Sequence, residues 1–157
     1  MGLASLQSGK ARILILVARL GLGGIFLYAA YTKLLLPWTI FAMSINSYNL
    51  LPEPLVIFIA RGLPWVELAL GVLLIAGWKL RYSAAVTSVL LVFFFGIMLR
   101  SYSKGLGIDC GCFGVGEALT AKTLARDGAL TAISIGLTVA AFLTARKPPA
   151  EQAAAQD

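Results

Sequence analysis

The stretch "PLVIFIARGLPWVELALGVLLIAGW", from Pro54 to Trp78, decides the fold of this chain. Its only charged side chains are Arg61 and Glu67, and every other residue is apolar, glycine or proline. An α-helix rises about 1.5 Å per residue, so about 20 apolar residues are enough to cross a hydrocarbon core of about 30 Å. The stretch therefore predicts a helix that spans a membrane.

Three more blocks of this kind lie along the chain, which has 157 residues, 59% of them hydrophobic and 13% charged. About a quarter of the residues of a soluble domain are charged, so too little polar sequence remains here to cover a soluble core. We therefore predict an all-α, polytopic membrane protein, a four-transmembrane-helix bundle formed by residues 1–145. The other blocks are "ILILVARLGLGGIFLYAAYTKLLL" (Ile13–Leu36), "YSAAVTSVLLVFFFGIML" (Tyr82–Leu99) and "GALTAISIGLTVAAFLTA" (Gly128–Ala145).

The segments around the first block are read from their composition. Lys10 and Arg12 precede this block, as in a secretory signal sequence, but it is longer than the about 7–15 apolar residues of such a signal, so we favour an uncleaved span. The half-apolar segment "LLPWTIFAMSINSYNLLPEP" that follows, residues 35–54, predicts a short helix lying on the outer membrane surface. The polar tail, residues 146–157, is expected to be disordered on the cytoplasmic side.

Basic residues set the expected orientation. The net charge is +6, but Lys and Arg flank the spans and form no continuous stripe, so we expect the lipid bilayer as their partner and no nucleic acid. They are densest on the side of the two termini, where the connection "KLR" (Lys79–Arg81) joins the second and third spans. We expect this side to be the cytoplasm and the long loop between Arg100 and Asp127 to lie on the periplasmic side of a bacterial inner membrane.

That loop contains "GLGIDCGCFGVG" (Gly105–Gly116), with both cysteines of the chain, Cys110 and Cys112. The chain has no histidine, which removes the commonest general base and metal ligand. Zinc normally takes four ligands, and the loop offers two thiols and Asp109, so no complete metal site is expected. A soft ion such as Cu(I), held by two thiolates, stays an alternative.

Two neighbouring thiols are well suited to exchange electrons. A disulfide between Cys110 and Cys112 closes a small, strained ring, and strained disulfides are more oxidising than structural ones. Gly111 between them supplies backbone freedom, whereas the cross-link would constrain almost no chain. We interpret the two cysteines as a redox pair, with two inert thiols as the alternative; Arg100 and Lys104 would lower the thiol pKa, and Asp109 would raise it.

Four charges lie inside the predicted spans, where each costs about 2.5–3.5 kcal/mol unless it faces the protein interior or reaches the interface. They are Arg19, Lys33, Arg61 and Glu67. Counted from a common inner boundary, Arg19 and Glu67 are close enough in depth to predict an ion pair between the first two spans. Arg61 is expected higher, near Lys33 and the cysteine loop, either binding an anionic substrate or a quinone oxygen or pairing with Glu53 or Asp109.

The order "GGIFLYAAYTKLLLPWTIFAMSINSYNLLP", "RGLPWVELALGVLLIAG", "DCGCFG" and "ARDGAL" resembles the MauE family of methylamine-utilisation membrane proteins, within the DoxX-like four-helix group. The resemblance runs from about Arg12 to Ala145. It implies an inner-membrane protein linked to maturation of the small subunit of methylamine dehydrogenase, a disulfide-containing client, alongside a periplasmic thioredoxin-like partner.

Carried onto this chain, the resemblance makes Cys110 and Cys112 the redox pair. Supporting residues are expected beside them, namely Asp109, Gly111, Phe113 and Gly114. A quinone is the one cofactor considered. The alternatives are a non-enzymatic assembly or small transport subunit and a quinone-linked sulfur-oxidation subunit, and the sequence does not set the oligomeric state.

Overall fold

The computed structural model describes residues 9–113 and 116–145, and these form five helices. The helices are α1 (Gly9–Leu35), α2 (Trp38–Ser47), α3 (Glu53–Ala76), α4 (Leu80–Ser103) and α5 (Ala121–Ala145). Within the described ranges, the extended pairing consists of one isolated antiparallel bridge between Asp109 and Ala118. The predicted all-α architecture is confirmed. The predicted tail, residues 146–157, lies outside the described residues.

Four of these helices, α1, α3, α4 and α5, are long and apolar enough to cross a membrane. They coincide with the four predicted blocks, and α2 takes the place of the predicted short helix. Helix α5 begins earlier than its block, at Ala121, because Thr120 and Thr123 cap it. The Thr123 N–H donates to Thr120 Oγ1 at 3.3 Å, and the Thr120 N–H donates to Thr123 Oγ1 at 2.8 Å. The apolar blocks mark the hydrocarbon stretch, while capping decides where the helix begins.

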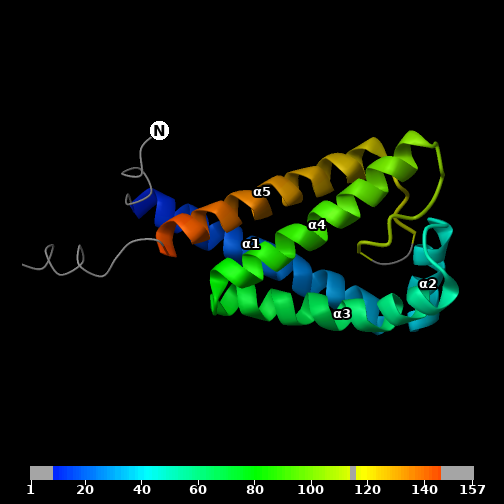
Figure 1. Cartoon of the computed structure of the whole chain (residues 1–157), viewed down its shortest axis with the longest axis horizontal. Helices are drawn as coiled ribbons and strands as arrows, with labels where there is room; N and C mark the ends of the chain where they lie inside the picture. Colours follow the sequence, from blue (N-terminus) through cyan, green and yellow to red (C-terminus); the bar gives the residue numbers. More distant parts are fainter. Residues whose placement is uncertain (1–8, 114–115, 146–157) are drawn as a thin grey trace, which may run out of the picture.

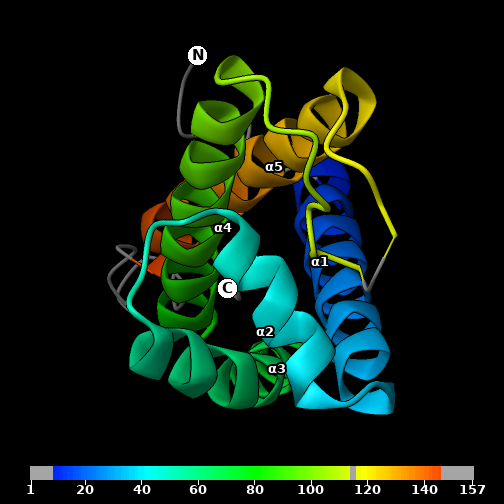
Figure 2. The same ribbon diagram turned by 90° about the vertical axis from the view of Figure 1, so that its right-hand side faces the viewer.

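Helices α1 and α3 pack along each other, as do α4 and α5, and α1 also contacts α5 (Figure 1). The start of α1, the turn from α3 to α4 and the end of α5 lie at one end of the bundle. Helix α2 and the described parts of the connection from α4 to α5, residues 104–113 and 116–120, lie at the other end (Figures 1 and 2). We call this connection the cysteine loop. The two halves of the chain therefore meet where both cysteines are.

The bundle carries apolar side chains on its outside and polar ones within. Phe58 and Val89 are 78% and 70% exposed, whereas the hydroxyl residues Thr87 and Ser134 are fully buried. Between α4 and α5, Ser88 and Thr138 share a hydrogen bond of 2.8 Å. This distribution is the one expected where lipid replaces water around the helices, because buried polar groups then join helices to one another.

Candidate functional site

The cysteine loop folds back on itself beside the end of α4. The Cys110 N–H donates to the carbonyl of Glu117 at 2.8 Å, and the Leu119 N–H donates to the carbonyl of Ile108 at 2.9 Å. Cys110, Leu119 and Met98 of α4 form a buried apolar cluster. The loop therefore holds its first thiol inside the protein, with Cys110 only 6% exposed and Cys112 half-buried.

Both cysteines are free thiols, and their sulfurs and one Asp127 carboxylate oxygen all lie within 4.8 Å of one another. The Cys112 N–H donates to Cys110 Sγ at 3.4 Å. Gly111 makes this turn at φ +69°, and a Cβ at that position would lie 3.3 Å from Cβ of Ser44 in α2. The structure thus brings together the two predicted thiols, the predicted Gly111 and an unpredicted acid, Asp127 in place of Asp109.

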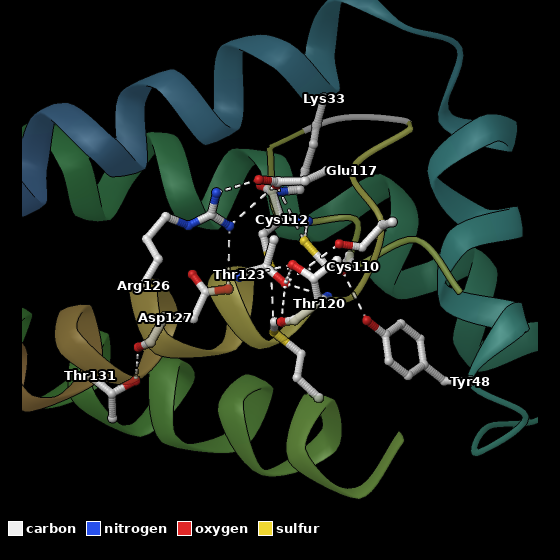
Figure 3. A network of polar contacts seen from close by, with 12 residues as sticks. Lys33, Tyr48, Cys110, Cys112, Glu117, Thr120, Thr123, Arg126, Asp127 and Thr131 are labelled. Carbon is white, nitrogen blue, oxygen red and sulfur yellow. Dashed lines mark hydrogen bonds and ion pairs between the residues drawn. The ribbon is translucent and has the colours of Figure 1, made fainter. Parts of the chain in front are cut away.

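The thiol of Cys110 faces a half-exposed ion pair (Figure 3). Cys110 Sγ lies 3.5 Å from Glu117 Oε2, and Arg126 donates to both oxygens of that carboxylate. The Arg126 guanidinium also lies 4.4 Å from the ring centroid of the predicted Phe113, which packs against Tyr28 of α1. Glu117 and Arg126 were not predicted as site residues, because only the fold of the loop brings them close to Cys110.

The thiol of Cys112 lies against α4 and the start of α5. Cys112 Sγ lies 3.7 Å from the sulfur of Met98, which is 2% exposed. Asp127, 6% exposed, lies beside the same sulfur and receives a 3.4 Å contact from Arg126. Each thiol therefore has its own carboxylate, Glu117 near the surface for Cys110 and Asp127 inside for Cys112.

The two thiols differ in acidity. A hydrogen bond from Cys112 holds the pKa of Cys110 below its ordinary value, against the opposing effects of burial and of Glu117. The same hydrogen bond to Cys110, together with burial, raises the pKa of Cys112. The Arg126 hydrogen bond lowers the pKa of Glu117. In the reduced pair Cys110 is therefore the more acidic thiol, and Cys112 holds its proton more tightly.

A buried ion pair between α1 and α3 contacts the cysteine loop. Lys33 Nζ of α1 lies 2.9 Å from each carboxylate oxygen of Glu67 in α3, and their side chains are 3% and 9% exposed. The same ammonium donates to the carbonyl of Cys112 at 2.7 Å (Figure 3). From the other side, the Tyr48 hydroxyl donates to the carbonyl of Cys110 at 3.0 Å. Two helices and the cysteine loop meet at Lys33.

This pairing corrects the predicted ion pair between Arg19 and Glu67. Arg19 instead donates to the carbonyl of Ile75 at 3.3 Å and packs against Gly77 at the end of α3. Arg19 is thus level with the end of α3, so the first turns of α1 extend past that end. The assumption of a common inner boundary placed Arg19 too close to Glu67.

The other predicted polar residues are spread more widely. The Arg61 guanidinium is stacked 4.3 Å from the ring centroid of Trp38 in α2, so it lies away from the cysteines and pairs with neither Glu53 nor Asp109 among the described residues. Asp109 Oδ2 accepts a 3.4 Å hydrogen bond from the Gly116 N–H. Gly114 lies outside the described residues. Only Lys33 and Glu67 of the four intramembrane charges belong to the cysteine site.

A cavity of about 120 Å³ lies next to the pair, with walls drawn from all five helices and the cysteine loop. Most of the lining is aliphatic or aromatic, including Phe26, Phe41, Leu63 and Phe94. Both cysteines also line it. So do the charged residues Lys33, Glu67 and Asp127, all of which lie beside the cysteines. The cysteine pair therefore adjoins two different environments, the half-exposed ion pair of Glu117 with Arg126 and the mainly apolar cavity.

Comparison with known proteins agrees with this architecture. No curated protein and no solved structure matches the chain. The family model described as methylamine utilisation protein MauE matches residues 11–143, which include all but the ends of the four spans, together with the Lys33–Glu67 pair and both cysteines. The chain is a multi-pass membrane protein that belongs to the MauE family.

Proposed function

We propose that this protein is a thiol–disulfide exchange factor of a bacterial inner membrane, with Cys110 and Cys112 as its redox pair on the periplasmic side. In this role it accepts electrons from a thioredoxin-like partner that matures a disulfide-containing client, such as the small subunit of methylamine dehydrogenase. The observation that supports this most is the pair itself, two adjacent free thiols of unequal acidity that lie beside a half-exposed carboxylate.

The exchange balances as a two-electron step. The partner supplies two thiols, and one of its thiolates attacks a sulfur of the Cys110–Cys112 disulfide to form a mixed disulfide. The second partner thiolate breaks that bond. The partner leaves with a new disulfide, and this protein holds two thiols, so two electrons and two protons have been transferred. Glu117 accepts from the Cys110 thiol at 3.5 Å and lies where a proton from the outer side would arrive or leave.

The surroundings of the two sulfurs give them different tasks. Cys110 adjoins Glu117 and Arg126, whose side chains are 31% and 35% exposed, so a periplasmic partner meets the pair on this side. Cys112 lines the cavity next to Met98. It is released as a thiol when the partner attacks Cys110, and in the reverse direction it resolves the mixed disulfide. The Lys33 and Tyr48 hydrogen bonds to the two cysteine carbonyls hold the turn between them in place.

Trapping of the mixed disulfide tests this proposal. In cells, Cys112→Ser leaves Cys110 without its resolving thiol, and we expect it to accumulate a reducible covalent complex with a thioredoxin-like protein. Cys110→Ser should trap less, and the double Ser variant, the matched control, should trap nothing. The proposal fails if neither single variant traps a partner and the double variant still supports client maturation.

A second candidate function, soft-metal binding, is favoured by one observation. Met98 Sδ lies 3.7 Å from Cys112 Sγ, and Cys110 Sγ is within 4.8 Å of the latter. Metal–sulfur bonds of about 2.3 Å place the sulfurs of a trigonal site about 4 Å apart, and two thiolates with a thioether favour Cu(I). Titration of the reduced protein with Cu(I) against a chromogenic chelator should give one equivalent, weakened by Met98→Leu; equal binding by both proteins excludes this site.

A further inference from the structure

The cavity beside the cysteines has chemistry that the exchange with a periplasmic partner does not use. It lies between the helices, its walls are mainly aliphatic and aromatic, and both cysteines line it. The ion pair of Glu117 with Arg126 is not part of its lining. The pair is therefore accessible from two chemically different sides, one polar and one apolar.

An occupant of this cavity has to meet three conditions. Its bulk is apolar, because rings such as Phe26, Phe41 and Phe94 form the walls. It presents polar atoms at one end, because Lys33, Glu67 and Asp127 all gather beside the cysteines. It also reacts with a dithiol, because both cysteines are part of the wall. Membrane quinones combine these properties, having a flat ring with carbonyl oxygens and an isoprenoid tail that dissolves in lipid.

We propose that this cavity binds the head group of a membrane quinone, which takes the electrons of the reduced Cys110–Cys112 pair. The inference rests on the proposed function and names the electron acceptor of that site. Oxidation of the two thiols to a disulfide releases two electrons and two protons, and these convert one quinone to one quinol. The pair is thereby returned to the state that accepts electrons from the partner.

The positions of the carboxylates supply the proton path. Asp127 lies within 4.8 Å of both sulfurs and lines the cavity, so it receives the proton that Cys112 gives up and passes it toward the ring oxygens. Lys33 already donates to both Glu67 oxygens and to the Cys112 carbonyl, so its role is to position the loop.

The experiment compares two tryptophan substitutions on the same helix. Leu90 of α4 lines the cavity, whereas Val92, two residues further along, is 48% exposed on the outside and does not line it. The larger indole ring of a tryptophan at position 90 would fill part of the cavity, whereas one at position 92 would stay outside it. We therefore expect Leu90→Trp to weaken quinone binding by about tenfold or more and Val92→Trp to match the wild type. Reduced proteins in lipid nanodiscs are mixed with decylubiquinone without oxygen, and quinol formation and thiol loss are measured.

Binding is measured separately from turnover. A photoreactive ubiquinone analogue should label residues of the cavity wall in the wild type and in Val92→Trp, and labelling should fall in Leu90→Trp. The double Cys→Ser protein should still be labelled but form no quinol. The inference is overturned if quinol formation and labelling are the same in both tryptophan variants, or if neither occurs in the wild type.

A small disulfide serves as the second oxidant, and it separates this inference from the proposed function. Exchange with oxidised glutathione depends on the thiols alone and should be unchanged in Leu90→Trp. If the pair exchanges with glutathione but does not reduce quinone, only the quinone inference fails. If the pair reacts with neither oxidant, the proposed function fails with it.

Discussion

Cys110 and Cys112 have different polar neighbours although one residue separates them. Cys110 accepts a hydrogen bond from the Cys112 N–H and adjoins the half-exposed Glu117, whereas Cys112 Sγ lies 3.7 Å from the sulfur of the buried Met98. The positive φ of Gly111 turns the chain between the two cysteines. Both residues line the same cavity, but Cys110 is the one that also contacts the ion pair of Glu117 and Arg126.

The acidity of Cys110 gives a pH prediction. The thiolate is the form that reacts with alkylating agents, so a lowered pKa keeps Cys110 reactive to lower pH than a free cysteine, whose pKa is about 8.5. Cys112→Ala removes the side-chain hydrogen bond that stabilises the Cys110 thiolate, keeps the one from the backbone N–H, and should move the pH midpoint of Cys110 labelling up. Glu117→Gln removes a nearby negative charge and should move the pH midpoint of Cys110 labelling down. Iodoacetamide labelling followed by peptide mass spectrometry measures each midpoint; an unchanged or lower midpoint in Cys112→Ala contradicts the assignment.

The ion pair between Lys33 and Glu67 gives a stability prediction. Removing one member of a buried pair costs about 3–5 kcal/mol because the other charge is left without a partner. Lys33→Met should therefore destabilise the protein strongly, and the double variant Lys33→Met/Glu67→Leu should recover most of the loss. Thermal unfolding in detergent compares the three proteins. A double variant no more stable than the single one would show that Lys33 acts through its bond to the Cys112 carbonyl instead.

At the scale of elements, α1 and α3 approach closely through two glycines. A Cβ added to Gly23 would lie 3.0 Å from the carbonyl oxygen of Gly71 and 2.6 Å from Ile75, and a Cβ added to Gly71 would lie 3.0 Å from the carbonyl of Gly23. Small residues allow membrane helices to pack in this way. The contact sets the register of α1 on α3, which brings Lys33 to Glu67.

This contact can be tested with a matched pair of substitutions in α1. Gly23→Ala should lower the free energy of unfolding by about 1–3 kcal/mol, because the added methyl group meets the backbone carbonyl of Gly71, which cannot move aside as a flexible side chain can. Gly21→Ala, with nothing within 4 Å of its added Cβ, should be neutral or slightly stabilising. Unfolding in SDS-containing mixed micelles measures both. Equal effects of the two substitutions would contradict a close approach at Gly23.

The position of α1 along α3 is also the feature of the helices that the sequence did not predict. Composition and block length predicted the four spans and the short helix, because lipid imposes length and apolarity on any spanning helix. The partner of Glu67 depends on how far α1 slides along α3, and nothing within either block specifies that. The same holds for Glu117 and Asp127: the two thiols are visible as a pair in the sequence, but their carboxylates come from residues 7 and 15 positions away that only loop folding brings close.

At the scale of the whole molecule, α2, the cysteine loop and the polar end of the cavity all lie at one end of the bundle, opposite the start of α1 and the end of α5 (Figures 1 and 2). If the basic residues orient the chain as proposed, this end is periplasmic. A membrane-impermeant maleimide should then label the reduced cysteines in intact spheroplasts and leave them unlabelled in sealed inverted vesicles. The reverse pattern would place the pair on the reducing side and contradict the exchange with a periplasmic partner.

The proposed exchange function requires that Cys110 and Cys112 form a disulfide reversibly. Equilibration of the purified protein with glutathione buffers of graded potential, followed by acid quenching and intact-mass analysis, tests this directly. We predict a loss of two hydrogens per chain in a single reversible two-electron transition, in which the ratio of oxidised to reduced protein changes tenfold per about 30 mV. Two thiols that stay free in every buffer, or that oxidise only between chains, would contradict it.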